Sequence, residues 1–134
     1  WSWTFGTPGE GSSQASPVHT FTMPGNHPVT LTITNADGCT HTIAGIFRIQ
    51  PGPVVIPNVF TPNGDGSNEY FVIENGQYYT NTLSIFNRWG QEVFNANNYR
   101  NTWRAIDIPD GTYYYVFVTD EDGRHHTGHV TILR

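Results

Sequence analysis

Apolar and polar residues alternate with a period of two in several stretches of this 134-residue chain. The alternation is clearest over residues 1–5 (WSWTF) and at Val29, Leu31 and Ile33 within HPVTLTITN. Successive side chains of a β-strand point to opposite faces, so this period predicts strands with one buried face. A less regular strand is expected over residues 40–49, after the turn sequence NADG.

The second part of the chain contains short apolar stretches separated by the turn sequences PNGDGSN, ENGQ, NRWG, IPDG and DEDGR. Strands at this spacing are typical of a β-sandwich, and no stretch has helical periodicity. Residues 112–119 and 126–133 flank an Asp-Gly turn, which predicts a hairpin. The full set of expected strands is 54–60, 70–74, 82–87, 91–95, 111–119 and 125–133. The residues expected in or beside the core are Leu83, Ile85, Val93, Trp103, Tyr115 and Val130.

A proline pair separates the two parts. Pro51 and Pro53 in QPGPV disfavour both helix and central-strand pairing, so a domain boundary is expected there. The predicted organisation is a first segment over residues 1–50, a linker over 51–53 and a second segment over 54–134. The first segment has too few apolar positions for an independent sandwich core.

Composition supports an all-β protein and excludes several functions. Aromatic residues make up 14% of the chain and charged residues 13%, with frequent Thr, Val, Gly and Pro. The net charge is -5 and the six basic residues are dispersed arginines, which excludes a typical nucleic-acid binder. No apolar run is long enough for a transmembrane helix. The serines lack a nucleophile motif, so no enzyme is expected. The chain begins without Met or a signal peptide, and is interpreted as part of a longer protein.

The sequences WSWTFGTPGEGSS, PVHTF and MPGNHPVTLTITNADGC resemble the second half of a PKD domain. Thr4 and Thr7 replace two usual aspartates, and His27 replaces a usual aromatic residue. The opening strands of that family are absent, so the resemblance implies a partial PKD-like β-sandwich. It also implies that Cys39, the single cysteine, pairs with a cysteine upstream of Trp1 in the whole protein.

Residues 54–134 resemble the type B C-terminal domain of type IX secretion cargo, also called the gliding-motility-associated C-terminal domain. The matching stretches are IPNVFTPNGDGSNEYF, LSIFNRWGQEVF, IPDGTYYYVF and GHVTILR, the last interpreted as the natural end of the protein. Glu69 replaces a usual Asp, and the loop after Trp103 is shortened. The resemblance implies an immunoglobulin-like β-sandwich and export across the outer membrane of Bacteroidetes. It further implies a large secreted, adhesin-like cell-surface protein whose partners are the type IX translocon and an outer-membrane β-barrel protein.

The glycine-rich loop TPNGDGSNE leaves two interpretations open. Asn63, Asp65, Asn68 and Glu69 are oxygen donors of the kind that calcium prefers. The same residues also accept hydrogen bonds in turns, while glycines supply positive φ angles. The alternative function is therefore a calcium-supported adhesive or glycan-binding module, with calcium as its cofactor.

Two further places are candidates for partner binding. The turn FNRWGQ is expected to hold Gly90 in a left-handed conformation, with Arg88 and Trp89 either contacting a partner or covering the open end of the core. In GHVTILR, Val130 and Ile132 share one strand face, which leaves Leu133 and Arg134 for recognition. The competing interpretation is that this strand only completes the sandwich.

Clusters of tyrosine and histidine suggest chemistry that strand geometry disfavours. Tyr113 and Tyr115 share a strand face while Tyr114 takes the other, so a sugar-stacking surface is not favoured over packing, even with Tyr78 and Tyr79. His125 and His129 lie roughly 13 Å apart along one face, and His126 points the other way. These histidines cannot converge on one zinc ion.

Overall fold

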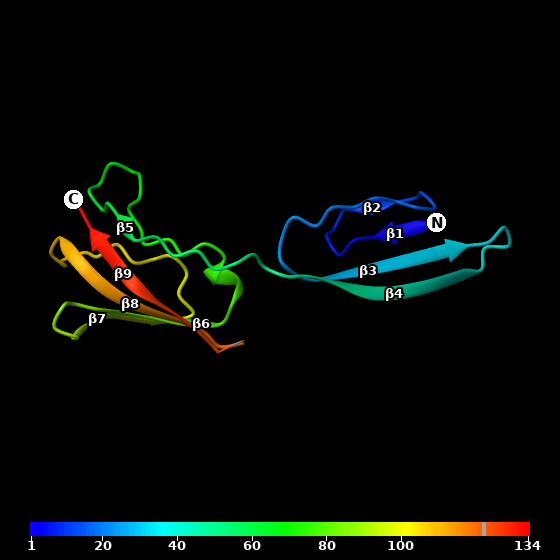
Figure 1. The fold of residues 1–134 in the computed structure, drawn as a ribbon. Coiled ribbons are helices and arrows are strands. Elements are labelled where there is room, and N and C mark those ends of the chain that lie inside the picture. Colours follow the sequence, from blue (N-terminus) through cyan, green and yellow to red (C-terminus); the bar gives the residue numbers. More distant parts are fainter. Residues whose placement is uncertain (122) are drawn as a thin grey trace. The chain divides into compact units, whose positions relative to one another are not determined.

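A computed structural model describes residues 1–121 and 123–134 of the chain, which divides into two compact units, Trp1–Pro51 and Gly52–Arg134. We call these unit 1 and unit 2 and describe each by itself. Strands dominate both units (Figure 1), and the helical structure of the described residues is a single 3₁₀ turn, η1, at Gly76–Tyr78. The all-β prediction is confirmed.

Unit 1 holds one antiparallel sheet in the order β2-β1-β3-β4. Its strands are β1 (Ser2–Thr4), β2 (Gly11–Ser12), β3 (Gly25–Thr34) and β4 (Thr40–Ile49). The expected NADG turn joins β3 to β4. There Asn35 accepts hydrogen bonds through its side-chain oxygen from the backbone N–H groups of Asp37 (3.0 Å) and Cys39 (2.9 Å), and Gly38 adopts a φ of 82°.

The two faces of the unit 1 sheet differ in chemistry. Trp3, Leu31 and Ile43 lie opposite one another on neighbouring strands and therefore share one face. The other face carries a threonine ladder, in which Thr4 bonds Thr30 at 2.5 Å and Thr32 bonds Thr42 at 2.9 Å. One face of this sheet is therefore apolar and the other polar.

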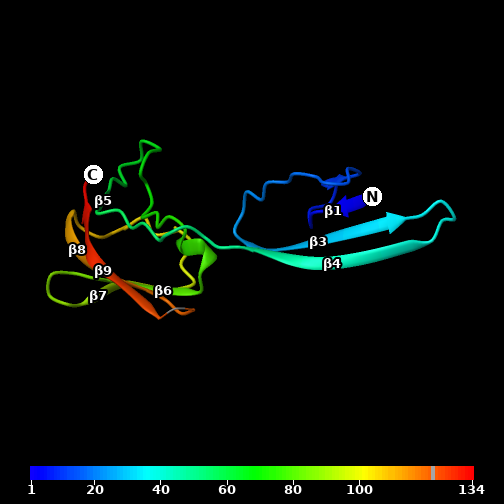
Figure 2. The same ribbon diagram turned by 45° about the vertical axis from the view of Figure 1, so that its right-hand side comes forward.

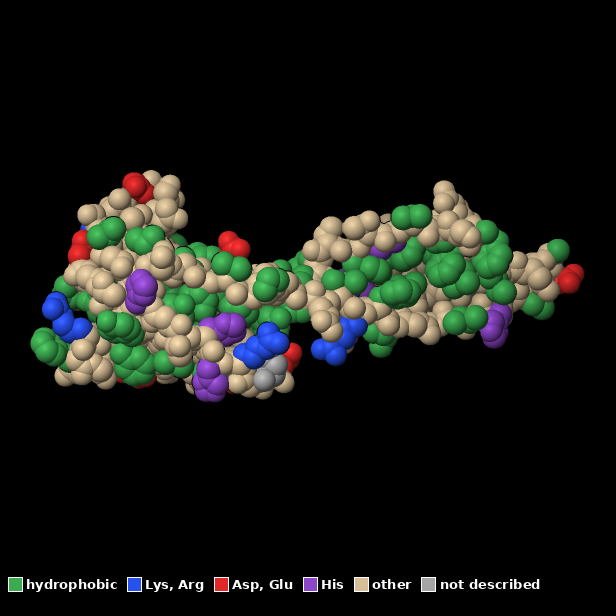
Figure 3. Space-filling model, in the orientation of Figure 1, with side chains coloured by type: hydrophobic (Ala, Val, Ile, Leu, Met, Phe, Trp, Pro, Cys, Tyr) green, Lys and Arg blue, Asp and Glu red, His purple; other side chains and the backbone are tan. Residues whose placement is uncertain are grey.

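The apolar face of unit 1 is only partly covered. Residues 13–24 cross it, with the His19 ring stacked on Phe5 at 4.2 Å and the Phe21 ring 6.2 Å from Phe47. Within this fully described unit, Phe5 and Val29 are the hydrophobic residues that become buried, whereas Ile43 stays 60% exposed and Phe47 58% exposed. Figure 3 shows hydrophobic side chains gathered at the surface between β1 and the β3–β4 hairpin.

Unit 2 holds a five-stranded sheet in the order β5-β9-β8-β6-β7. Only the β5–β9 pair is parallel, and the pairs β9–β8, β8–β6 and β6–β7 are antiparallel (Figure 2). The strands are β5 (Val59–Phe60), β6 (Asn81–Phe86), β7 (Glu92–Asn97), β8 (Gly111–Thr119) and β9 (Arg124–Ile132). The predicted β8–β9 hairpin is present, although Asp122 of its predicted Asp-Gly turn lies outside the described residues.

The core of unit 2 lies between this sheet and a layer of extended segments. Leu83, Ile85, Phe117, Val130 and Ile132 point inward from the strands and are fully buried, which follows from their period-two spacing. The segments on the other side contribute Phe71, Ile73, Tyr99, Trp103 and Ala105, while Phe60 of β5 and Tyr113 of β8 complete the core from the sheet. All six residues predicted in or beside the core are confirmed there, with Val93 and Tyr115 packed at its edge.

The predicted strands 54–60 and 70–74 are largely wrong as regular strands. Only β5 and one isolated bridge, Val55 to Glu74, form there. Pro57 has no N–H to donate, and neighbouring backbone groups bond side chains instead of a ladder. The N–H of Ile73 donates to the Asn101 side-chain oxygen at 2.9 Å, and the Tyr99 hydroxyl donates to the Phe71 carbonyl at 2.5 Å.

A buried amide ties the extended layer to the sheet. The Asn81 side chain, 1% exposed, donates to the carbonyls of Gly76 (2.9 Å) and Tyr79 (3.0 Å). Its oxygen accepts from the backbone N–H of Tyr99 at 2.8 Å. A buried amide with all these partners satisfied fixes η1 and the segment after β7 against β6.

Candidate functional site at one end of unit 2

The TPNGDGSNE loop is closed by its own hydrogen bonds. The Thr61 N–H donates to the Asn68 carbonyl at 3.0 Å, and the Asn63 side-chain oxygen accepts from the Asp65 N–H at 3.0 Å. Asp65 in turn accepts from the Ser67 N–H at 2.8 Å, which lowers the pKa of the Asp65 carboxyl. Gly64 and Gly66 have φ angles of 84° and 87°, as the turn interpretation requires.

Glu69 holds this loop against the body of unit 2. It is buried, and its Oε1 accepts from the N–H groups of Gly64 (2.7 Å) and Gly66 (3.3 Å). Its Oε2 pairs with the Arg104 guanidinium at 3.1 Å, and that guanidinium also lies 5.3 Å from the Tyr70 ring centroid. Burial opposes ionisation of Glu69, but the Arg104 and backbone hydrogen bonds outweigh it and lower the pKa.

Three of the four candidate calcium ligands, Asn63, Asp65 and Glu69, use their side chains to hold the loop, and Asn68 takes part through its backbone carbonyl. The Glu69 carboxylate accepts hydrogen bonds at both oxygens, and Asn63 and Asp65 bond each other and the loop backbone. Among residues 1–121 and 123–134, no group of three or more histidine, cysteine or acidic side chains is placed to hold a metal ion. The calcium interpretation stays a prediction that this geometry does not favour.

The turn between β6 and β7 presents Arg88 and Trp89 to solvent. Asn87 accepts through its side-chain oxygen from the N–H groups of Trp89 (2.9 Å) and Gln91 (3.0 Å), and Gly90 has the expected positive φ of 77°. Trp89 is 77% exposed, and the Arg88 guanidinium carbon lies 5.7 Å from its ring centroid. The interpretation that Trp89 covers the core is wrong, because the capped turn directs the indole outward.

Leu133 and Arg134 make different contacts with the rest of unit 2. Leu133 donates its N–H to the Phe60 carbonyl at 3.3 Å, and its side chain is 50% exposed. Arg134 instead turns back into the domain: its guanidinium bonds the Asp110 carboxylate and, at 2.6 Å, the Ala105 carbonyl. The Arg134 N–H and guanidinium together outweigh desolvation and lower the pKa of Asp110.

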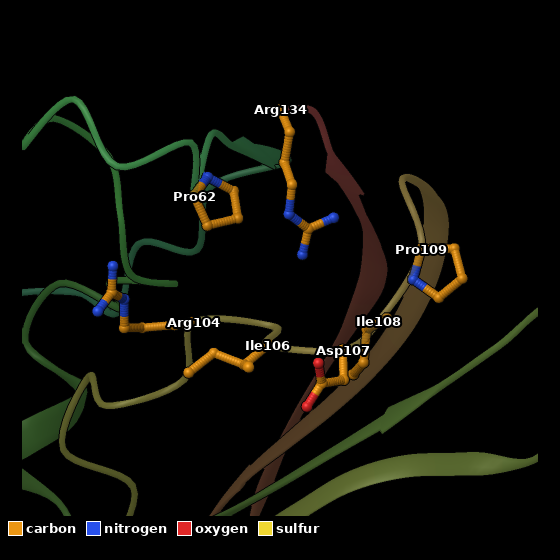
Figure 4. A pocket seen from close by; sticks show the side chains of 7 residues that line it. All are labelled: Pro62, Arg104, Ile106, Asp107, Ile108, Pro109 and Arg134. Atoms are coloured by element: carbon orange, nitrogen blue, oxygen red, sulfur yellow. The ribbon is translucent and has the colours of Figure 1, made fainter.

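Two hollows flank the 105–110 loop. One, of about 460 Å³, is lined by Pro62, Arg104, Ile106, Asp107, Ile108, Pro109 and Arg134 (Figure 4). The other, of about 360 Å³, shares Asp107, Ile108 and Pro109 and extends to Arg88 and Trp89. Figure 4 shows the Arg134 side chain reaching between Pro62 and Pro109 toward the loop. The loop thus lies between the two predicted partner-binding places.

Sequence reasoning missed this loop. Ile106 is 69% exposed, and Ala105 and Asp107 adopt φ angles of 53° and 62°. Ile106 stands two residues from Ile108, a spacing that would place both on one strand face, so the sequence alone carries no sign that Ile106 is exposed. The left-handed conformation of an alanine leaves no trace in sequence, because alanine does not favour it.

The tyrosines of β8 and the histidines of β9 are divided between the two faces of the sheet. Tyr113 is buried in the core and Tyr114 is exposed on the outer face, so the two do not share a surface for stacking sugars. His129 lies opposite Tyr114, whereas His126 faces inward with its ring 6.1 Å from that of Phe117. This matches the predicted divergence of the histidines.

Comparison of the sequence with protein families identifies both units. Residues 54–132 match the family described as the CHU_C type IX secretion signal domain. The chain belongs to this family. Residues 1–49 match the PKD domain, and no curated protein sequence matches the chain. Neither domain family is enzymatic.

Membership in the type IX secretion signal family has direct consequences for location and partners. The secretion signal domain implies interaction with the type IX machinery and export across the outer membrane, to the surface or beyond. None of the helical structure in the described residues is long and apolar enough to cross a membrane. The surface centred on the 105–110 loop is part of this type IX secretion signal domain.

Proposed function

We propose that unit 2 is the export and docking domain of a large, adhesin-like cell-surface protein, recognised by the type IX translocon and an outer-membrane β-barrel partner. The match of residues 54–132 to the type IX secretion signal family carries this proposal. The PKD match over residues 1–49 supports the nature of the cargo, because β-domains in tandem make suitable spacers.

The exposed end of unit 2 supports docking through Arg88, Trp89, Gly90 and Leu133. Tryptophan and arginine are enriched among residues that dominate protein–protein binding energy. Trp89 and Leu133 are both apolar and exposed here, on rigidly bonded backbone. Arg134 has a different role in this proposal: it supports the surface from within, through Ala105 and Asp110.

Export of a reporter tests the function. A periplasmic reporter fused to residues 52–134 is expected to reach the surface or medium of a bacterium with a type IX system. The same fusion in a strain that lacks the translocon should stay in the periplasm, which controls for leakage. A reporter retained in the periplasm of both strains, with unit 2 folded, would refute the proposal.

Two single substitutions directly after β9 separate recognition from folding. Leu133→Ser removes an exposed apolar group and should reduce export with little change in Tm. Arg134→Ala removes the bonds to Asp110 and Ala105, so it should lower Tm as well as export. Unchanged export of Leu133→Ser would remove Leu133 from the docking surface.

A further inference from the structure

The 105–110 loop displays an apolar side chain on a backbone that is fixed before any partner binds. Ala105 is fully buried and Ile108 packs against the core, while Ile106 between them is 69% exposed. Isolated exposed apolar residues are common on protein surfaces. Ile106 differs from such residues because several hydrogen bonds fix the backbone on both sides of it, at Ala105 and at Pro109.

Two non-glycine residues of this loop, Ala105 and Asp107, have left-handed φ angles of 53° and 62°. Such a conformation is unfavourable for alanine and persists only where the surroundings enforce it. Here the Arg134 guanidinium and the Ile108 N–H (3.2 Å) both donate to the Ala105 carbonyl. The Tyr113 hydroxyl donates to the Pro109 carbonyl at 2.8 Å. The loop is thus preorganised, which reduces the entropy lost on binding.

The two most exposed large apolar side chains of unit 2 are Ile106, in this loop, and Trp89, in the turn between β6 and β7. Trp89 is 77% exposed and Ile106 69% exposed, above every other large hydrophobic residue described in the unit. Each lines one of the hollows that meet at residues 107–109. Exposed apolar groups beside adjoining hollows are typical of a surface that binds protein.

The arginines beside the two hollows indicate which charge a partner would carry. Arg104 and Arg134 are paired with Glu69 and Asp110, whereas no ion pair is found for Arg88 among the described residues. Arg88 lies over the Trp89 ring at the rim of the second hollow. Of the three arginines that line the two hollows, Arg88 is thus the one left for a partner, and a single cation is too little for an anionic membrane or a nucleic acid, which require several. One arginine beside an exposed tryptophan suits a partner protein that presents a single carboxylate next to an apolar pocket.

We propose that Ile106 and Trp89 are twin anchors that insert into apolar pockets of an outer-membrane protein of the secretion machinery, with Arg88 facing a carboxylate of that protein. This inference rests on the function proposed above and identifies the contact surface and the partner's chemistry. Arg134 is a positioning residue: it fixes the loop that carries Ile106 and makes no contact with the partner.

The test uses the complete 134-residue chain fused to a secreted reporter. Ile106→Ser is compared with a matched control, Tyr114→Ser, which removes an exposed aromatic group from the outer sheet face. Ile106→Ser should reduce the rate of export about tenfold with Tm unchanged, while Tyr114→Ser exports like the parent. Arg88→Glu should also reduce export, and Arg88→Lys should retain most of it.

Site-specific photo-crosslinking identifies the partner. A photoreactive residue at position 106 should crosslink to an outer-membrane component of the type IX machinery, and one at position 114 should not. Normal export of Ile106→Ser, or crosslinks from position 106 only to surface glycan or lipid, would overturn the inference. If the parent chain itself is not exported, the proposed function fails rather than the assignment of this surface.

Discussion

Both units contain strands in which apolar and polar residues alternate, but the apolar face of the sheet is largely open in unit 1 and covered in unit 2. In unit 1 the apolar face of a four-stranded sheet is crossed by one segment, and Ile43 and Phe47 stay largely exposed. In unit 2 a five-stranded sheet is covered by segments 61–80 and 98–110, which bury a continuous aromatic and aliphatic core. Alternation specifies which face is apolar, but a second layer decides whether that face becomes a core.

The largest expected effect comes from separating the units. Residues 52–134 should unfold in one cooperative transition, whereas residues 1–51 alone should show no cooperative transition, because they bury only Phe5 and Val29. Differential scanning calorimetry of both fragments measures this. A sharp heat-absorption peak from the fragment 1–51 would show that its sheet needs no further cover.

Two matched isoleucine-to-alanine substitutions, one in each unit, test this difference in burial. Ile85→Ala removes methyl groups from a fully buried site in unit 2 and should cost about 2–5 kcal/mol. Ile43→Ala alters an exposed position on the open face of unit 1 and should change stability by less than about 0.5 kcal/mol. Urea unfolding of the complete chain, followed by NMR signals from each unit, distinguishes the two. Equal losses would mean that Ile43 is covered in solution.

The buried amide of Asn81 tests how the second layer of unit 2 is attached. Asn81→Ala leaves the carbonyls of Gly76 and Tyr79 and the N–H of Tyr99 without their partner, and should cost about 1–3 kcal/mol. Asn97→Ala on the exposed edge strand is the control and should have a small effect. Hydrogen exchange should localise the loss to residues around η1. A uniform loss across unit 2 would contradict that localisation.

Most strands could be predicted from sequence, and much of the second layer and of the candidate site could not. β6, β8 and β9 alternate clearly because one face of each is buried, and β3 alternates as well, although Val29 is its only buried residue. The segment 70–74 is held by Asn101 and Tyr99, whose spacing obeys no period. The Arg134–Asp110 pair joins residues far apart in the chain. Such partners become visible only when the fold brings them together.

Acid should weaken unit 2 through its lowered carboxyl pKa values. Asp65, Glu69 and Asp110 all have a pKa below the ordinary value, so their ionised forms stabilise the fold above about pH 4. This contribution is lost as the pH falls through the lowered pKa values. The Tm of residues 52–134 should therefore fall between pH 6 and pH 3, and less steeply in Glu69→Gln. Parallel curves for the two proteins would show that Glu69 does not contribute.

The smallest expected effect is that of metal removal. Because Asn63, Asp65 and Glu69 bond the loop itself and Arg104, a chelator should leave the Tm of unit 2 unchanged. Calcium titration of the metal-free chain, followed by calorimetry, measures this directly. A rise of several degrees in Tm with calcium would restore the calcium-supported interpretation of the loop.

The place of β9 in the sheet affects when unit 2 becomes complete. β9 lies between β8 and the parallel strand β5, and it contributes the fully buried Val130 and Ile132. A polypeptide interrupted before residue 124 therefore leaves β5 unpaired and the core open. Closure depends on pairing across nearly the whole length of the unit, which must await synthesis of its final strand. Folding of this domain thus requires that its last strand has been synthesised, and chains that terminate before residue 124 lack the complete sheet and the closed core.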